Sequence, residues 1–187
     1  MGQLTFVTGG ARSGKSSFAE RLAASSGAAV SYLATLEPLD EEMRDRIARH
    51  QDQRPAAWQT IEAPHALASA FAEIPADNVV LLDCLSLWVS NRLLTLDDDP
   101  PPPAAAALEA ELDGELDMLI AHARERGAAT VIVSNEVGSG VVPPSVLGRV
   151  YRDLLGRANQ RVSLGADRAW LLVAGRALEL PAPDGSG

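Results

Sequence analysis

The sequence Gly9-Gly10-Ala11-Arg12-Ser13-Gly14-Lys15-Ser16 decides the fold of this chain. It has the G-x-x-x-x-G-K-[ST] spacing of a phosphate-binding loop. An apolar run, Leu4–Thr8, precedes it and a helix-compatible run, Ser17–Ala24, follows it, which is the strand–turn–helix context that the motif requires. Backbone N–H groups in such a loop point inward at an anion, and the helix N-terminus adds partial positive charge. The stretch therefore predicts a nucleoside triphosphate site. We expect Lys15 to reach the β- and γ-phosphates and the Ser16 hydroxyl to ligate Mg²⁺.

Five short apolar runs are spaced along the chain, and segments with helical character lie between them. The runs are Leu4–Thr8, Ala28–Ala34, Val79–Asp83, Thr130–Ser134 and Ala169–Val173. Each is almost continuously apolar, which is typical of strands buried on both faces. The alternation predicts an α/β fold with a mostly parallel central sheet and helices on both faces. We expect a single nucleotide-binding domain over residues 1–180 and a disordered tail over residues 181–187.

The second half of the chain contains two predicted helices and a proline-rich connector. Leucines recur at helical spacing in Ala105–Arg126, and a second helix is expected over Pro144–Leu164. The polar cluster Arg157–Arg161 on the second helix is either solvated or lines a neighbouring subunit's site. The four prolines in Asp97–Pro103 predict a stiff, exposed connector of extended character.

Composition and charge limit the functions that this chain can have. The formal net charge is −9, from 16 basic and 25 acidic residues, which argues against general nucleic-acid binding. The single cysteine, Cys84, allows no intramolecular disulfide and no cysteine zinc cluster, and we expect it to be a small buried side chain. No apolar run approaches the ~20 residues that span a bilayer. We therefore expect a cytoplasmic protein without stable membrane insertion.

Polar residues end two of the predicted strands. Asp83 ends the run Val79–Asp83, where a carboxylate either approaches Mg²⁺ from the side opposite the loop serine or caps the next helix. The stretch Asn135–Pro143 follows another strand at the carboxyl edge, where open α/β sheets bind ligands. We expect Asn135 and Glu136 to face that crevice, although a flexible turn without a ligand is the alternative. Trp88 either packs in the core or lies at a subunit interface.

A histidine surrounded by arginines lies soon after the second predicted strand. A helix is expected from Asp40 to about Gln53, on which Arg46 and His50 share a face, with Arg54 just beyond its end. One interpretation is a surface histidine on a charged helix. The other is a histidine that attacks a phosphate, because neutral imidazole is a good nucleophile near neutral pH. Neighbouring arginines would bind the phosphates and lower the pKa of the imidazole.

Taken together, these stretches resemble one enzyme family. The sequence is similar to the bifunctional adenosylcobinamide kinase / adenosylcobinamide-phosphate guanylyltransferases of cobalamin synthesis. The phosphate loop alone is shared by many families, whereas the other matching stretches are more specific. The resemblance rests on Thr8–Ser16, Tyr32–Thr35, Asp40–Glu62 with its Arg-His-x-x-x-Arg-Pro-x-x-Trp-x-Thr-x-Glu core, Leu81–Cys84, Asn135–Pro143, and Gly156-Arg157-x-Asn159-Gln160.

The resemblance implies a RecA-like P-loop NTPase fold, assembled as a trimer, with two activities. Adenosylcobinamide takes a γ-phosphate from ATP or GTP. GTP then guanylylates the enzyme histidine, and the GMP passes to adenosylcobinamide phosphate to give adenosylcobinamide-GDP. By motif position, His50 carries the GMP, and Lys15 is the second catalytic residue. The nucleotide contacts implied are Gly9, Gly10, Ala11, Arg12, Ser13, Gly14, Lys15, Ser16, Ala34, Thr35, Leu36, Gln51, Asp52, Gln53, Arg54, Glu62 and Asp83, with Ser16 and Asp83 at Mg²⁺.

The sequence departs from the family pattern at its edges. The proline-rich connector is a local elaboration, and Arg176–Leu180 stands where relatives usually have an apolar-proline or lysine ending. These departures concern substrate details more than the reaction. Two other functions are the alternatives. One is a plain small-molecule kinase without a covalent histidine. The other is a nucleotide-binding switch or RecA-like nucleic-acid motor, which the acidic charge disfavours.

Overall fold

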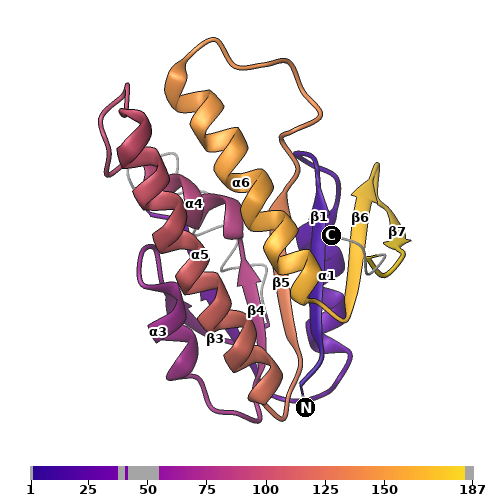
Figure 1. The fold of residues 1–187 in the computed structure, drawn as a ribbon. Helices are drawn as coiled ribbons and strands as arrows, with labels where there is room; N and C mark the ends of the chain where they lie inside the picture. The colour runs from indigo at the N-terminus through magenta and orange to yellow at the C-terminus, as the bar shows by residue number, and fades with distance from the viewer. Residues whose placement is uncertain (1, 38–40, 42–54, 184–187) are drawn as a thin grey trace.

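The fold is built from a seven-stranded sheet with helices on either side (Figure 1). It is seen in a computed structural model that describes residues 2–37, 41 and 55–183. The described elements, in chain order, are β1 (Leu4–Gly9), α1 (Lys15–Ala24), β2 (Val30–Ala34), β3 (Gln59–Glu62), α3 (Leu67–Ala72), β4 (Val79–Asp83), α4 (Leu85–Leu93), α5 (Pro102–Glu125), β5 (Thr130–Asn135), α6 (Val146–Gly165), β6 (Arg168–Val173) and β7 (Arg176–Leu180).

The strand order places the two motif-bearing strands near the middle of the sheet. The order is β3-β2-β4-β5-β1-β6-β7, and every neighbouring pair is parallel except β6 and β7. The phosphate loop follows β1, and Asp83 ends β4, so β5 alone separates the two strands. The predicted α/β fold with a mostly parallel central sheet is confirmed.

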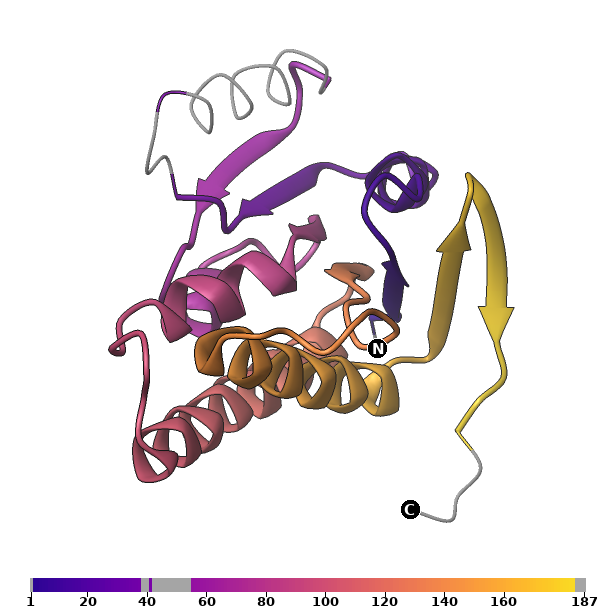
Figure 2. The ribbon, with the colours of Figure 1, turned by 90° about the horizontal axis from the view of Figure 1, so that it is seen from above.

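Two apolar clusters hold the layers together, one on each face of the sheet. On one face α1 buries Ala19 and Ala23 against alternate strand residues such as Val7 and Val133. On the other face α3, α4, α5 and α6 pack over residues such as Phe6. Figure 2 shows the same division, with α1 on one side of the sheet and the long helices on the other. Strands covered on both faces must be apolar throughout, which explains the continuous runs in the sequence.

Two strands were missing from the prediction. β3 has mostly exposed residues, and β7 is exposed along nearly its whole length, because both lie at the sheet edges. An edge strand has no second neighbour and need not be apolar, so neither shows the run of a buried strand. The sequence Gln59–Glu62 and the sequence Arg176–Leu180 were therefore not recognised as strands.

The proline-rich connector is shorter than predicted. Pro101 occupies the N-cap position of α5, and Pro102 and Pro103 lie in its first turn. The helix therefore begins three residues before the expected Ala105. The N–H groups of a first turn have no partner within the helix, and a proline there loses no hydrogen bond. Pro100 is buried rather than exposed. The prediction that all four prolines lie outside the helix is wrong.

Several predictions lie outside the described residues. They are the helix from Asp40 to Gln53, of which Glu41 alone is described, the histidine His50, and residues 184–187 of the tail. Trp88 is fully buried in the core of the chain, and its indole N–H donates to the His65 carbonyl at 2.8 Å, so the subunit-interface alternative is wrong. Among the helices that the structure describes, none is both long and apolar enough to cross a bilayer.

Candidate nucleotide-binding site

The phosphate loop lies at the carboxyl end of β1, where the motif predicts it. Gly14 has φ of +92°, in the left-handed region, and a Cβ there would lie 3.3 Å from the Gly175 Cα. Glycine therefore suits this position both conformationally and sterically. Lys15 begins α1, and its ammonium group donates to the Gly10 carbonyl at 3.2 Å. The lysine side chain is thus folded back over the loop, toward the space that phosphates occupy in such loops.

Two neighbouring segments brace the loop. The backbone N–H of Glu136, just after β5, donates to the Gly9 carbonyl at 3.0 Å. The N–H of Gly175, in the turn between β6 and β7, donates to the Ser13 carbonyl at 2.9 Å. The loop is therefore fixed from both neighbouring strands. A loop fixed in this way loses little conformational entropy when it binds an anion.

Asn135 and Glu136, which were expected to face the crevice, both make hydrogen bonds within the chain. One oxygen of the Glu136 carboxylate, Oε1, accepts from the N–H groups of Gly138 and Ser139, at 2.5 and 3.1 Å. It therefore stabilises its own turn. Asn135 pairs in register with Gly9 and donates its side-chain amide to the Ser86 hydroxyl at 2.9 Å.

Asp83 ends β4 on the other side of β5. One oxygen of its carboxylate, Oδ2, accepts a hydrogen bond from the Tyr32 hydroxyl at 2.9 Å. Asp83 and the loop that carries Lys15 lie at the same edge of the sheet, because β4 and β1 are both parallel to the strand between them, β5. The helix-cap alternative for Asp83 finds no support, because α4 has Cys84 as its N-cap and no side chain caps it.

A buried hydrogen-bond cluster holds the backbone just after Asp83. The Thr35 hydroxyl donates to the Cys84 carbonyl at 2.7 Å and accepts from the Cys84 N–H at 3.0 Å. The side-chain amide of Asn91 donates to the carbonyls of Thr35 and Pro64, at 2.7 and 3.1 Å. These bonds join the ends of β2, β3 and β4 to α4. The Thr35 hydroxyl both donates and accepts a hydrogen bond in this cluster, so it braces the site from within the chain.

The cysteine of this cluster is held in its neutral form. Burial and the adjacent Asp83 charge raise the pKa of the Cys84 thiol to about 11. Its sulfur lies 3.0 Å from the Ser86 hydroxyl oxygen. The Tyr151 hydroxyl donates to the Ser86 carbonyl at 3.2 Å, and burial raises the pKa of Tyr151 to about 12. These neutral groups form a scaffold between α4, β5 and α6. Cys84 is buried as predicted.

The polar cluster Arg157–Arg161 faces the neighbouring helix α5. Arg157 pairs with Glu109, and Arg161 binds Asp113 with two nitrogens and Asp117 with one. Asn159 donates to the Asn135 carbonyl at 3.0 Å. The two arginines therefore join α6 to α5, and Asn159 joins α6 to β5. The sequence could not show these contacts because it does not state which elements are neighbours.

The predicted site residues fall into three groups. The loop residues, together with Asp83, Ala34, Thr35 and Leu36, lie at the carboxyl edges of β1, β4 and β2. Glu62 ends β3 at the same edge of the sheet, pairing in register with Ala34, but two strands, β2 and β4, separate β3 from β5. The remaining members, His50 and Gln51 to Arg54, lie outside the described residues.

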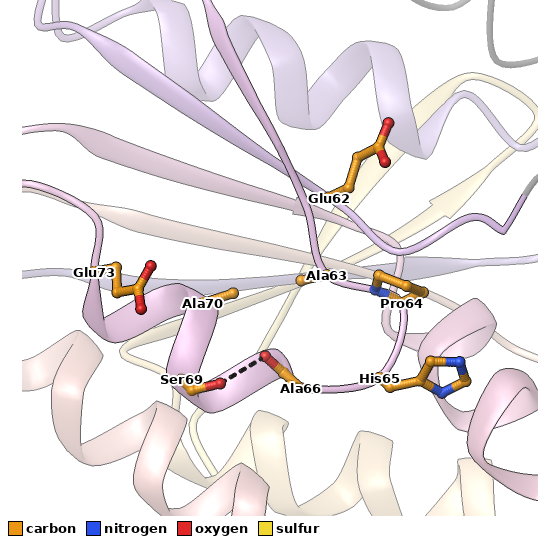
Figure 3. A pocket seen from close by; sticks show the side chains of 8 residues that line it. All are labelled: Glu62, Ala63, Pro64, His65, Ala66, Ser69, Ala70 and Glu73. Atoms are coloured by element: carbon orange, nitrogen blue, oxygen red, sulfur yellow. Dashed lines mark hydrogen bonds between the residues drawn. The ribbon is translucent and has the colours of Figure 1, made fainter.

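An open pocket of about 350 Å³ lies beside Glu62 (Figure 3). It is formed by the segment from Glu62 to Ala66 and by one side of α3, and none of the phosphate-loop residues lines it. Figure 3 shows the Glu62 and His65 side chains pointing in different directions. The His65 ring binds the Glu37 carboxylate at 2.9 Å, and among the residues that the structure describes His65 makes no hydrogen bond to Glu62. The pocket is therefore separate from the phosphate loop and shares only Glu62 with the predicted nucleotide contacts.

The donor set at the loop fits Mg²⁺ bound together with a nucleotide. Within the described part of the chain, no three His, Cys, Asp or Glu side chains are grouped as a metal site. Mg²⁺ at nucleotide sites needs only one or two protein ligands, because phosphates and waters supply the others. The Asp83 carboxylate has an oxygen that Tyr32 does not bind, and the Ser16 hydroxyl stands in the first turn of α1. Both groups are hard oxygen donors of the kind that Mg²⁺ prefers.

The class of protein follows from these features: an α/β nucleotide-binding protein with a P-loop and a strand-end carboxylate. Comparison with known proteins is more specific. The model of the family "Cobinamide kinase / cobinamide phosphate guanyltransferase" matches residues 5–180. The chain therefore belongs to this enzyme family.

Curated relatives match along almost their whole length. The bifunctional adenosylcobalamin biosynthesis protein CobP of Pseudomonas aeruginosa is 46% identical over 178 residues, covering 95% of this chain and 94% of its own. The protein CobU of Salmonella typhimurium is 42% identical, over 92% of this chain and 96% of its own. CobU of Escherichia coli is 41% identical over the same shares. Among solved structures, the RadB recombinase matches 90% of this chain and 73% of its own, with 15% identity and a TM-score of 0.49.

Proposed function

We propose that this chain phosphorylates adenosylcobinamide and then transfers GMP from GTP to the product, through a guanylylated His50. The observation that carries the proposal is the phosphate loop, with Lys15 folded over it, in a chain whose family match covers residues 5–180. The relatives are named as bifunctional, which supports both activities.

In the first reaction the hydroxyl of adenosylcobinamide attacks the γ-phosphorus of ATP or GTP, and the nucleoside diphosphate leaves. The N–H groups of the loop and the Lys15 ammonium group stabilise the charge that develops on the phosphate oxygens. Ser16 and Asp83 would hold Mg²⁺. When bound, the ion neutralises phosphate charge and orients the triphosphate.

In the second reaction an imidazole nitrogen of His50 attacks the α-phosphorus of GTP, and pyrophosphate leaves. A phosphate oxygen of adenosylcobinamide phosphate then attacks the same phosphorus, so that adenosylcobinamide-GDP forms and the imidazole is restored. The segment that carries His50 leaves the sheet after β2, at the same edge as the phosphate loop. A common nucleotide site for the two reactions is part of this proposal.

The proposal is tested by supplying adenosylcobinamide with Mg²⁺ and a labelled nucleotide. Label from γ-³²P ATP should appear in adenosylcobinamide phosphate, and label from α-³²P GTP should appear in adenosylcobinamide-GDP. Phosphate transfer without GMP transfer would favour a monofunctional kinase. Hydrolysis without transfer, stimulated by single-stranded DNA, would favour a nucleic-acid motor.

A further inference from the structure

We propose that Tyr32 is a positioning residue for Asp83, whose hydroxyl fixes one carboxylate oxygen and leaves the other for the metal ion of the bound nucleotide. The inference rests on the proposed function, in which Asp83 lies on the metal side of the site. It concerns a residue of β2 that the loop motif does not identify.

The contact joins two neighbouring strands. Tyr32 in β2 is 3% exposed, and its ring packs in the apolar cluster that α1 covers. Its hydroxyl donates to Oδ2 of Asp83 at 2.9 Å. Because the ring is held by packing, the hydroxyl has a fixed position, and a carboxylate bound by it cannot rotate freely.

The residue that follows β2 fixes the backbone next to Asp83. The Thr35 hydroxyl binds both the N–H and the carbonyl of Cys84. Tyr32 therefore holds the side chain of Asp83, while Thr35, just beyond the end of the same strand, holds the residue that follows Asp83. Together they leave the carboxylate few orientations.

The Asp83 charge has no basic partner among the described residues. The ion pairs found there involve other acids, and none of the described arginine, lysine or histidine side chains is paired with the Asp83 carboxylate. A neutral hydrogen bond orients a carboxylate without neutralising it. The negative charge therefore stays available for a cation, as a metal ligand requires.

The test compares two phenylalanine variants, because the chain has only two tyrosines. Tyr32→Phe removes the hydroxyl that binds Asp83. Tyr151→Phe is the matched control, since its hydroxyl binds the Ser86 backbone carbonyl and no carboxylate. Mn²⁺ is the probe, titrated into the whole protein at saturating β,γ-imido ATP, and free Mn²⁺ is measured by electron paramagnetic resonance. Thermal unfolding of each variant is measured alongside.

We expect Tyr32→Phe to weaken Mn²⁺ binding about 10-fold, which is typical of losing a group that orients a metal ligand. Tyr151→Phe should leave the Mn²⁺ affinity within about 2-fold of the native value, even if it lowers the unfolding temperature as much as Tyr32→Phe does. In the Asp83→Asn background, Tyr32→Phe should have no further effect, because the two residues act as one unit.

Three outcomes would overturn the inference. Equal Mn²⁺ affinity in Tyr32→Phe and the native protein would show that the hydroxyl does not prepare the site. An undiminished effect of Tyr32→Phe in the Asp83→Asn background would show that it does not act through Asp83. If Asp83→Asn binds Mn²⁺ as tightly as the native protein, the metal-side role of Asp83 fails as well. Product formation from adenosylcobinamide, measured separately, decides whether the proposed reaction itself survives.

Discussion

Lys15 is the only lysine in the chain, so its chemistry can be followed without interference from other lysines. Its ammonium group binds the Gly10 carbonyl, and among the described residues no carboxylate is paired with it. The charge is therefore directed to the loop. A single cation in this position decides how well a triphosphate is held during transfer.

Replacing Lys15 with alanine should reduce phosphate transfer to adenosylcobinamide by about 100-fold or more, as expected when a preorganised charge is lost from the transition state. The rate is measured with γ-³²P ATP. Arg21→Ala is the control, because Arg21 lies on the same helix and stacks on Phe18 outside the loop. Lys15→Ala retaining a third or more of the native rate would contradict the role of the loop.

The Cys84 thiol should make stability depend on alkaline pH. Its pKa is about 11 in the folded chain, against 9.0 for an ordinary thiol. Between these values the unfolded chain loses the proton and the folded chain keeps it. The free energy of unfolding should therefore fall as pH rises from about 9 to 11, by about 1 kcal/mol per pH unit. The stabilisation that the neutral thiol contributes should be fully present below pH 9.

This dependence is measured by urea unfolding at several pH values in the native protein and in Cys84→Ala. The difference in unfolding free energy between the two proteins should shrink as pH rises through this window. A constant difference would show that the thiol ionises as easily in the folded chain as in the unfolded chain. The sequence predicted that Cys84 is buried, but it could not predict that Tyr32 donates to Asp83 or that Thr35 binds the Cys84 backbone. These depend on which strands and helices are neighbours.

Among the elements, α6 shows how much apolar packing and surface ion pairs each contribute to the free energy of unfolding. Leu155 is fully buried, whereas Arg161 is partly exposed in its ion pairs with Asp113 and Asp117 on α5. Leu155→Ala should lower the free energy of unfolding by about 2–5 kcal/mol, because it opens a cavity in the core. Arg161→Ala should cost about 1 kcal/mol or less, since exposed ion pairs are screened by water. Urea unfolding measures both, and a larger loss in Arg161→Ala would contradict this ranking.

The elements also show where sequence reasoning succeeds. The five central strands were predicted because burial on both faces requires continuous apolar runs. The edge strands β3 and β7 carry no such signal, and the prolines of Pro100–Pro103 do not reveal which of them begin a helix. The order of strands in the sheet was not predicted, since a parallel sheet can connect the same runs in several orders.

At the scale of the whole molecule, the family resemblance predicts a trimer. Val141 and Val142, in the connection between β5 and α6, are 95% and 59% exposed, and exposed apolar residues are common where another chain packs. We predict a mass three times the 19.7 kDa of one chain, measured by light scattering during size-exclusion chromatography. A mass of one chain at micromolar concentration would contradict the prediction.

The central claim is that one chain carries out both phosphate transfer and GMP transfer, the second through a covalent histidine. The phosphate loop was predicted from sequence because its motif is local. His50 was singled out by its arginine-rich surroundings and by the resemblance, and it lies outside the described residues. Its role must therefore be established chemically.

The most direct measurement is to incubate the protein with α-³²P GTP and Mg²⁺, denature it, and follow the protein-bound label. The account predicts a label that is acid-labile and alkali-stable, as a phosphoramidate is, that is absent from His50→Ala, and that adenosylcobinamide phosphate removes from the native protein. No label in the native protein, or equal label in His50→Ala, would contradict it.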